Sequence, residues 1–103
     1  MEVLMGISDQ TLEKLRKFCE SRGINTMYLF GSYARNEATP SSDMDLLVEF
    51  NPGLQLSYLD ILNLKEDLRQ IIGTQVDIVE EKAIRNPLRK KRILEERVLL
   101  YAS

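Results

Sequence analysis

Two aspartates, Asp43 and Asp45, stand one residue apart at the start of an apolar segment, Leu46 to Val48. Side chains on a strand alternate between its faces, so the two carboxylates would point to the same side, roughly 6.5–7 Å apart at the backbone. That spacing lets both bind one or two divalent cations. Two metal ions about 3.5–4 Å apart commonly stabilise the attacking and leaving oxygens of a phosphoryl displacement. Magnesium suits such a site, because it takes few carboxylates together with phosphate oxygens.

A glycine and a serine, Gly31 and Ser32, end another short apolar segment, Tyr28 to Phe30. A helical turn that begins near Ser32 would direct backbone N–H groups and a hydroxyl at an anion. Taken alone, the glycine is explained as the end of a strand, and the spacing required for a P-loop is absent. Together with Asp43 and Asp45, the pair predicts a phosphate cradle beside a metal site.

Two features of the composition limit the chemistry. The chain has no histidine, which excludes a Ser/His or Cys/His nucleophile pair and a zinc site of Cys and His ligands. Carboxylates must therefore carry any metal or acid–base chemistry. The net charge of −2 argues against broad, non-specific binding of nucleic acid by the whole domain. The single cysteine, Cys19, cannot form an internal disulfide and is expected to pack in the core.

Capping residues and hydrophobic spacing predict the elements that position these groups. Ser8 and Ser57 are expected N-caps, and Gly23 and Gly73 are expected stops. The expected elements are a helix over 9–22, strands over 28–30 and 43–50, a helix from 57 to 73, a strand over 75–79, a helix that begins at Asn86-Pro87, and a short closing strand over 98–101.

Asp77 interrupts an otherwise apolar strand. Burying an unpaired carboxylate is very costly, so this side chain must be paired, bound to a metal or exposed. Two interpretations follow. Asp77 lies on a solvent face of the sheet, or it joins Asp43 and Asp45 in one site.

Basic residues also have two interpretations each. Arg35 could form a salt bridge with a nearby acid such as Glu37, or it could contact a triphosphate and order the loop. A run of cations lies on the last helix and is either a solvated face or a patch for RNA phosphates or an acidic partner. This run is Arg85, Arg89, Lys90, Lys91 and Arg92, in which the three arginines follow an i, i+4, i+7 spacing.

The length of 103 residues predicts a single domain over 1–103. No apolar run approaches the roughly 20 residues that span a bilayer, and the first residues lack the features of a signal sequence. We therefore expect a cytoplasmic protein without membrane association.

The segment Gly31-Ser32-Tyr33-Ala34-Arg35, followed closely by Ser42-Asp43-Met44-Asp45-Leu46-Leu47-Val48, resembles the signature of the minimal nucleotidyltransferases, a branch of the DNA polymerase beta-like superfamily. The resemblance covers essentially the whole chain. It implies an α/β (α+β) fold: one compact domain with a mixed sheet, helices mainly on one face and the carboxylates at the rim. The family usually has glycine after the arginine, whereas this chain has Asn36. Asparagine tolerates positive φ, so the turn is expected to survive.

The resemblance also implies a reaction, the transfer of AMP from ATP to an acceptor with loss of pyrophosphate. One or two Mg²⁺ ions would be held by three catalytic carboxylates, of which the third would complete the metal site or act as a base. These carboxylates are Asp43, Asp45 and Asp77. The expected nucleotide contacts are Gly31, Ser32, Arg35 and Ser42.

Members of the family commonly act as antitoxins, and their partner is a HEPN-domain ribonuclease toxin that they can adenylylate on a tyrosine. The resemblance therefore implies a hetero-oligomer with a HEPN toxin, in which nucleic acid is not required. Two alternatives stay open. The domain could be a non-catalytic, nucleotide-binding antitoxin that acts by complex formation alone, or it could modify RNA or a small hydroxylated molecule.

Overall fold

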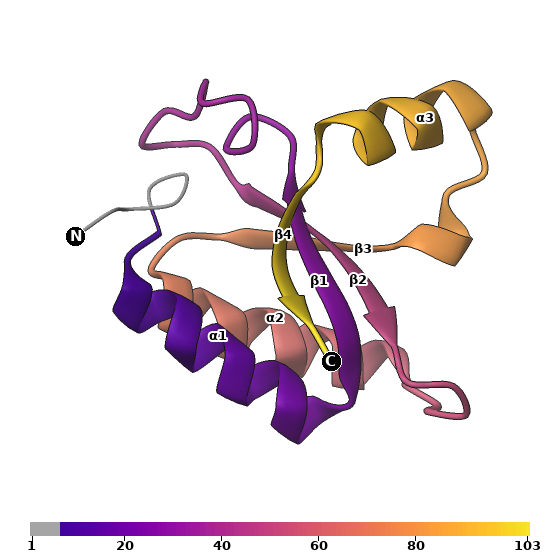
Figure 1. Ribbon diagram of the computed structural model, residues 1–103. Coiled ribbons are helices and arrows are strands. Elements are labelled where there is room, and N and C mark those ends of the chain that lie inside the picture. The colour runs from indigo at the N-terminus through magenta and orange to yellow at the C-terminus, as the bar shows by residue number, and fades with distance from the viewer. Residues whose placement is uncertain (1–6) are drawn as a thin grey trace.

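A four-stranded mixed sheet forms the centre of the fold in the computed structural model, which describes residues 7–103 (Figure 1). The strand order is β3-β2-β1-β4. Strand β1 (Ile24–Phe30) pairs antiparallel with β2 (Met44–Phe50) and with β4 (Val98–Ala102). Strand β3 (Val76–Glu80) pairs parallel with β2. The predicted mixed sheet is therefore confirmed.

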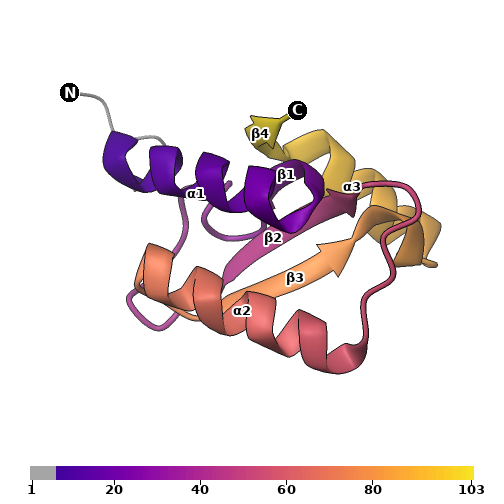
Figure 2. The same ribbon diagram turned by 90° about the horizontal axis from the view of Figure 1, so that it is seen from below.

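Helices cover the sheet unequally. Helix α1 (Asp9–Arg22) and helix α2 (Tyr58–Ile72) lie side by side on one face, as Figure 2 shows. A short 3-10 helix, η1 (Glu81–Ala83), leads to helix α3 (Pro87–Glu96), which packs against the other face. The expectation of helices mainly on one face is confirmed for α1 and α2, while α3 covers part of the opposite face.

The two faces carry separate hydrophobic cores because strand side chains alternate. The larger core lies under α1 and α2 and contains the fully buried Leu15, Leu29, Leu46 and Leu68. The smaller core lies under α3. Its buried members are Phe30, Leu47, Ile84 and Ile93. Successive residues of one strand, such as Leu46 and Leu47, thus belong to different cores.

Local capping explains why the helix bounds agree with the prediction. The Ser8 hydroxyl accepts a hydrogen bond from the backbone N–H of Thr11, which satisfies a free donor of the first turn. Ser57 and Asp60 form a reciprocal capping box at the start of α2. Gly23 and Gly73 end the two helices, as expected.

Strand bounds were predicted less well. Strand β1 begins at Ile24 rather than Tyr28, because its first half pairs with the end of β2 through Ile24 and Phe50. Strand β2 begins after Asp43, and β3 extends to Glu80. The prediction relied on runs of apolar residues, and the polar residues in these segments interrupt such runs although they pair within the sheet. Within the described residues, no helix is long and apolar enough to cross a membrane.

The core thiol gives a test of this packing. Cys19 is fully buried, and burial raises the pKa of its thiol to about 12. The reactive thiolate is therefore much scarcer than in an exposed cysteine. We expect native protein to react with a thiol reagent such as DTNB only at the rate of unfolding, and urea-unfolded protein to react at once. Rapid reaction of the folded protein would contradict the packing of α1.

Candidate active site

The strand register brings two of the predicted carboxylates together. Asp45 on β2 is the direct partner of Asp77 on β3, and neighbouring strands lie about 4.8 Å apart. Asp45 is two residues before Leu47 and Asp77 is two residues before Val79, so each aspartate shares a face of its strand with a residue of the core under α3. Both carboxylates therefore emerge on the face that α3 partly covers.

The electrostatics show that Asp43 shares this neighbourhood. The pKa of Asp45 lies above its usual value, mainly because burial penalises its charged form and further because the charges of Asp77 and Asp43 repel it. The positive charges of Arg35 and Arg89 act in the opposite direction. The half-buried Asp45 therefore lies near the charges of two exposed acids, Asp43 and Asp77.

The donor set suits a hard cation. In the part of the chain that the structure describes, no three acidic or cysteine side chains are arranged as a complete metal-binding cluster. The available donors at this edge are carboxylate oxygens, and the exposure of Asp43 and Asp77 leaves room for water and phosphate oxygens. This combination matches the preference of Mg²⁺ for a few carboxylates plus substrate oxygens. The assignment of Asp43, Asp45 and Asp77 as metal ligands stays a prediction.

Gly31 is required beside Asp45. It is the residue after Phe30, the partner of Asp45 in the β1–β2 register, and its φ of 75° lies in the left-handed region. A β-carbon at this position would collide with the carboxylate oxygen Oδ2 of Asp45. Glycine is therefore needed both for the backbone conformation and for the close approach of the carboxylate.

The turn predicted near Ser32 is present but does not continue into a helix. The N–H of Arg35 donates to the carbonyl of Gly31 at 3.1 Å, and the N–H of Glu37 donates to the carbonyl of Ser32 at 2.8 Å. Asn36 adopts a φ of 59°, so asparagine fits where the family usually has glycine. The roles of Gly31 and Ser32 in nucleotide binding stay predictions.

Glu96, which the sequence did not indicate, connects α3 to this turn. Its Oε1 accepts hydrogen bonds from the N–H of Gly31 and from the Arg35 guanidinium, both at 3.2 Å. Arg35 also donates to Glu37 at 2.9 Å, so the predicted salt bridge is confirmed and Glu96 is a second partner. These carboxylates raise the pKa of Arg35. Glu96 lies 61 residues from Arg35, and no local pattern relates the two.

Ser42 organises the loop that precedes the aspartates. Its hydroxyl accepts a hydrogen bond from the N–H of Thr39 at 2.9 Å, and its carbonyl accepts one from the Thr74 hydroxyl at 3.5 Å. These bonds join the loop to the residues before β3 and so help position Asp43. A contact of Ser42 with nucleotide stays a prediction.

The sheet, the glycine–serine turn and the facing carboxylates define the nucleotidyltransferase class of α/β domains. A family model described as "Nucleotidyltransferase domain" matches residues 12–100. The chain therefore belongs to this family and is a nucleotidyltransferase.

Relatives with assigned names resemble this chain over most of its length. A Methanocaldococcus jannaschii protein, MJ1379, named as a candidate protein adenylyltransferase, is 40% identical over 93 residues, which cover 89% of this chain and 91% of the relative. Protein adenylyltransferase MntA of Thermococcus cleftensis is 34% identical over 76 residues, which cover 74% of this chain and 75% of the relative. The family resemblance seen in the motifs is thus confirmed by whole-chain comparison.

Solved structures share the fold. A chain from a toxin–antitoxin crystal structure with AMP-PNP matches with a TM-score of 0.72 at 21% identity, covering 89% of this chain and 73% of that chain. A chain from a Shewanella oneidensis complex, a tri-AMPylated HEPN toxin with an MNT antitoxin, matches with a TM-score of 0.65 at 20% identity, covering 91% of this chain and 71% of that chain. Identities this low support the fold alone.

The contact between Gly31 and Asp45 can be tested with a matched pair of glycine substitutions. Gly31→Ala and Gly53→Ala both place alanine at a positive φ, which costs about 1–2 kcal/mol. Only Gly31→Ala also drives a methyl group into Asp45, since a β-carbon at Gly53 meets nothing within 4 Å. We expect a larger loss of unfolding free energy in urea for Gly31→Ala, together with loss of nucleotidyl transfer. Equal effects of the two substitutions would contradict the close approach.

Proposed function

We propose that this chain transfers AMP from ATP to a tyrosine hydroxyl of a partner HEPN-type ribonuclease toxin and thereby acts as its antitoxin. The observation that carries the proposal is the register of Asp45 against Asp77, beside a turn whose glycine admits Asp45. The choice of AMP and of a protein acceptor is supported by relatives named as protein adenylyltransferases. The choice of a HEPN partner is supported by the toxin–antitoxin complexes with the same fold.

The proposed step is an in-line displacement. The tyrosine oxygen attacks the α-phosphorus of ATP, a new P–O bond forms, and the bond from that phosphorus to the bridging oxygen breaks. Pyrophosphate leaves with the electron pair of the broken bond. The phenolic proton passes to Asp77, which is exposed at the edge of the sheet and can meet the acceptor. Mg²⁺, when bound by Asp43 and Asp45, supplies charge neutralisation at the transferring phosphate.

The remaining site residues would bind and orient the nucleotide. Gly31 and Ser32 would cradle phosphate oxygens at the end of β1, where the absence of a side chain lets a phosphate come close to the backbone. Arg35 is held at the edge of the turn by Glu37 and Glu96. In that position it orders the turn and adds positive charge near the triphosphate. We also propose that residues 1–103 form one nucleotidyltransferase domain, supported by the family match over 12–100.

The carboxylates can be tested by isosteric substitution. Asp45→Asn and Asp77→Asn keep the side-chain shape and remove a charge that the transition state requires, so we expect AMP transfer to fall at least about a hundredfold. Asp9→Asn, an exposed aspartate in the first turn of α1, is the matched control and should keep full activity. The measurement is the intact mass of a co-expressed HEPN partner after incubation with Mg²⁺ and ATP, in which each transfer adds one AMP.

Two other results of this mass measurement would favour the alternative functions. If the partner is neutralised by wild type and by both variants without any gain in mass, the chain is a binding antitoxin and not an adenylyltransferase. If mass is gained only on RNA or on a small molecule, the proposed protein acceptor is wrong and the assignment of the chain as an AMP-transferring enzyme stands.

A further inference from the structure

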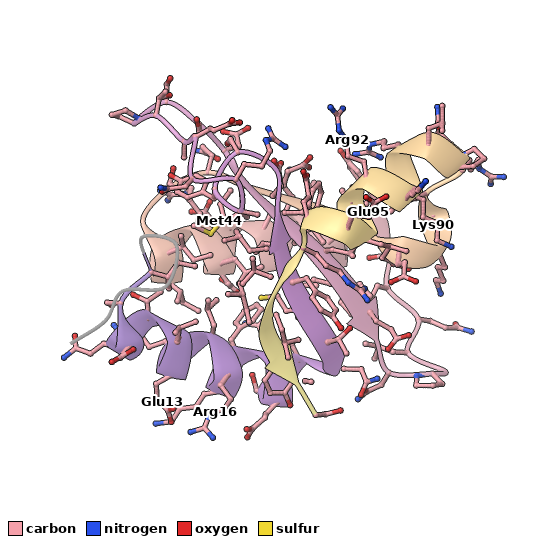
Figure 3. The ribbon with its side chains drawn as sticks, turned by 45° about the horizontal axis from the view of Figure 1, so that its top comes forward. Glu13, Arg16, Met44, Lys90, Arg92 and Glu95 are labelled. Atoms are coloured by element: carbon pink, nitrogen blue, oxygen red, sulfur yellow. The ribbon has the colours of Figure 1, made fainter. Side chains whose placement is uncertain are left out.

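Cations around an exposed apolar residue begin just before α3 and continue along one side of it. We define the arginine stripe as Leu88, Arg89 and Arg92 on α3 together with Arg85, which lies two residues before the first residue of the helix. All four side chains are exposed, and Leu88 keeps 79% of its accessible surface. Figure 3 shows Arg92 and Lys90 projecting from opposite sides of α3. Lys90 therefore lies away from the side of α3 that carries Arg92 and is not part of the stripe.

The three arginines of the stripe differ from the other arginines in lacking carboxylate partners. Within residues 7–103, none of them lies within ion-pair distance of an acid. Every other arginine does: Arg16 pairs with Glu13, Arg22 with Asp67, Arg35 with Glu37 and Glu96, Arg69 with Glu66, and Arg97 with Glu81. Among the arginines of the described residues, those without a carboxylate partner are thus confined to α3 and the segment just before it.

The arginine stripe adjoins the catalytic edge. Glu96, seven residues after Arg89 and on the same side of α3, holds the N–H of Gly31 and the Arg35 guanidinium. These bonds join the helix directly to the turn beside Asp45. Arg89 is close enough for its charge to act on Asp45. A molecule that lies along the stripe would therefore reach the site at which the acceptor must arrive.

We infer that the arginine stripe docks an acidic segment of the acceptor polypeptide, on one side of the tyrosine that receives AMP. Acidic side chains of this segment would pair with Arg85, Arg89 and Arg92, and an apolar side chain would pack on Leu88. The inference rests on the proposed function, because it assigns the chemistry that surrounds the acceptor hydroxyl. Docking along α3 would bring that hydroxyl to Asp45 and Asp77.

The composition of the stripe favours a polypeptide over RNA. Single-stranded RNA is typically bound by aromatic side chains that stack on its bases, and α3 contains none. An exposed leucine between arginines is instead typical of a protein contact, in which an apolar centre is surrounded by polar groups. Exposed charges act over about a Debye length, close to 8 Å at physiological salt, so binding is expected to weaken as salt rises.

The test is a binding measurement without ATP, by fluorescence anisotropy. The probes are a labelled tyrosine peptide with glutamates and one leucine around the tyrosine, the same peptide with lysine in place of glutamate, and a labelled oligouridylate. Arg85→Glu/Arg92→Glu reverses two charges of the stripe and leaves Arg89, which acts on Asp45. Lys14→Glu/Lys17→Glu reverses two exposed charges on α1 and changes the net charge equally. Circular dichroism confirms that both variants are folded.

We expect wild type and the α1 variant to bind the acidic peptide alike, and the stripe variant to bind it roughly tenfold more weakly. The lysine peptide should bind no better to wild type than the acidic peptide binds to the stripe variant. No binding of the acidic peptide by wild type, an equal loss in both variants, or tighter binding of the oligouridylate would overturn the inference.

The same assay separates this inference from the proposed function. Asp45→Asn should retain the acidic peptide, because the arginine stripe is unchanged. Stripe-dependent binding in the absence of any AMP transfer would reject the proposed function and keep the docking site. AMP transfer to the partner at equal efficiency in wild type and in the stripe variant would reject the docking site and keep the proposed function.

Discussion

Two carboxylates held opposite each other on parallel strands repel, and most features of the site depend on this arrangement. Asp45 and Asp77 cannot separate, because the β2–β3 ladder fixes their backbones as direct partners. Burial and like charge raise the pKa of Asp45, so the site favours any ligand that brings positive charge. The fold keeps this unfavourable pair near the edge of the sheet, where β3 is the outermost strand within residues 7–103 and solvent, cations and substrate have access.

Helix α3 is the second determinant of the site. It packs through Ile93 on the small core, and through Glu96 it binds both the Gly31 backbone and Arg35. The helix therefore orients the glycine turn relative to the aspartates and at the same time carries two of the unpaired arginines, Arg89 and Arg92. Catalytic geometry and acceptor docking would both be sensitive to the position of this one short helix, which has few buried residues of its own.

The assignment of function is supported by two independent kinds of observation. Sequence comparison places the chain in the nucleotidyltransferase domain family, and relatives named as protein adenylyltransferases match most of its length. The structure adds the physical reason for the motif. Gly31 lies at a positive φ and Asp45 occupies the space of its β-carbon, so Asp45 and the glycine are parts of one packing arrangement.

The sequence by itself determined the local features of this protein. Caps at Ser8 and Ser57 act within a few residues, so the bounds of α1 and α2 were predictable. The motif also located the second strand, although β2 includes Asp45 and begins just after Asp43. Tertiary structure decided the rest. The pairing of Asp45 with Asp77, the covering of their face by α3 and the hydrogen bonds of Glu96 all depend on strand order and helix packing between residues far apart in the chain. No local periodicity encodes such contacts, because they arise only when the sheet assembles.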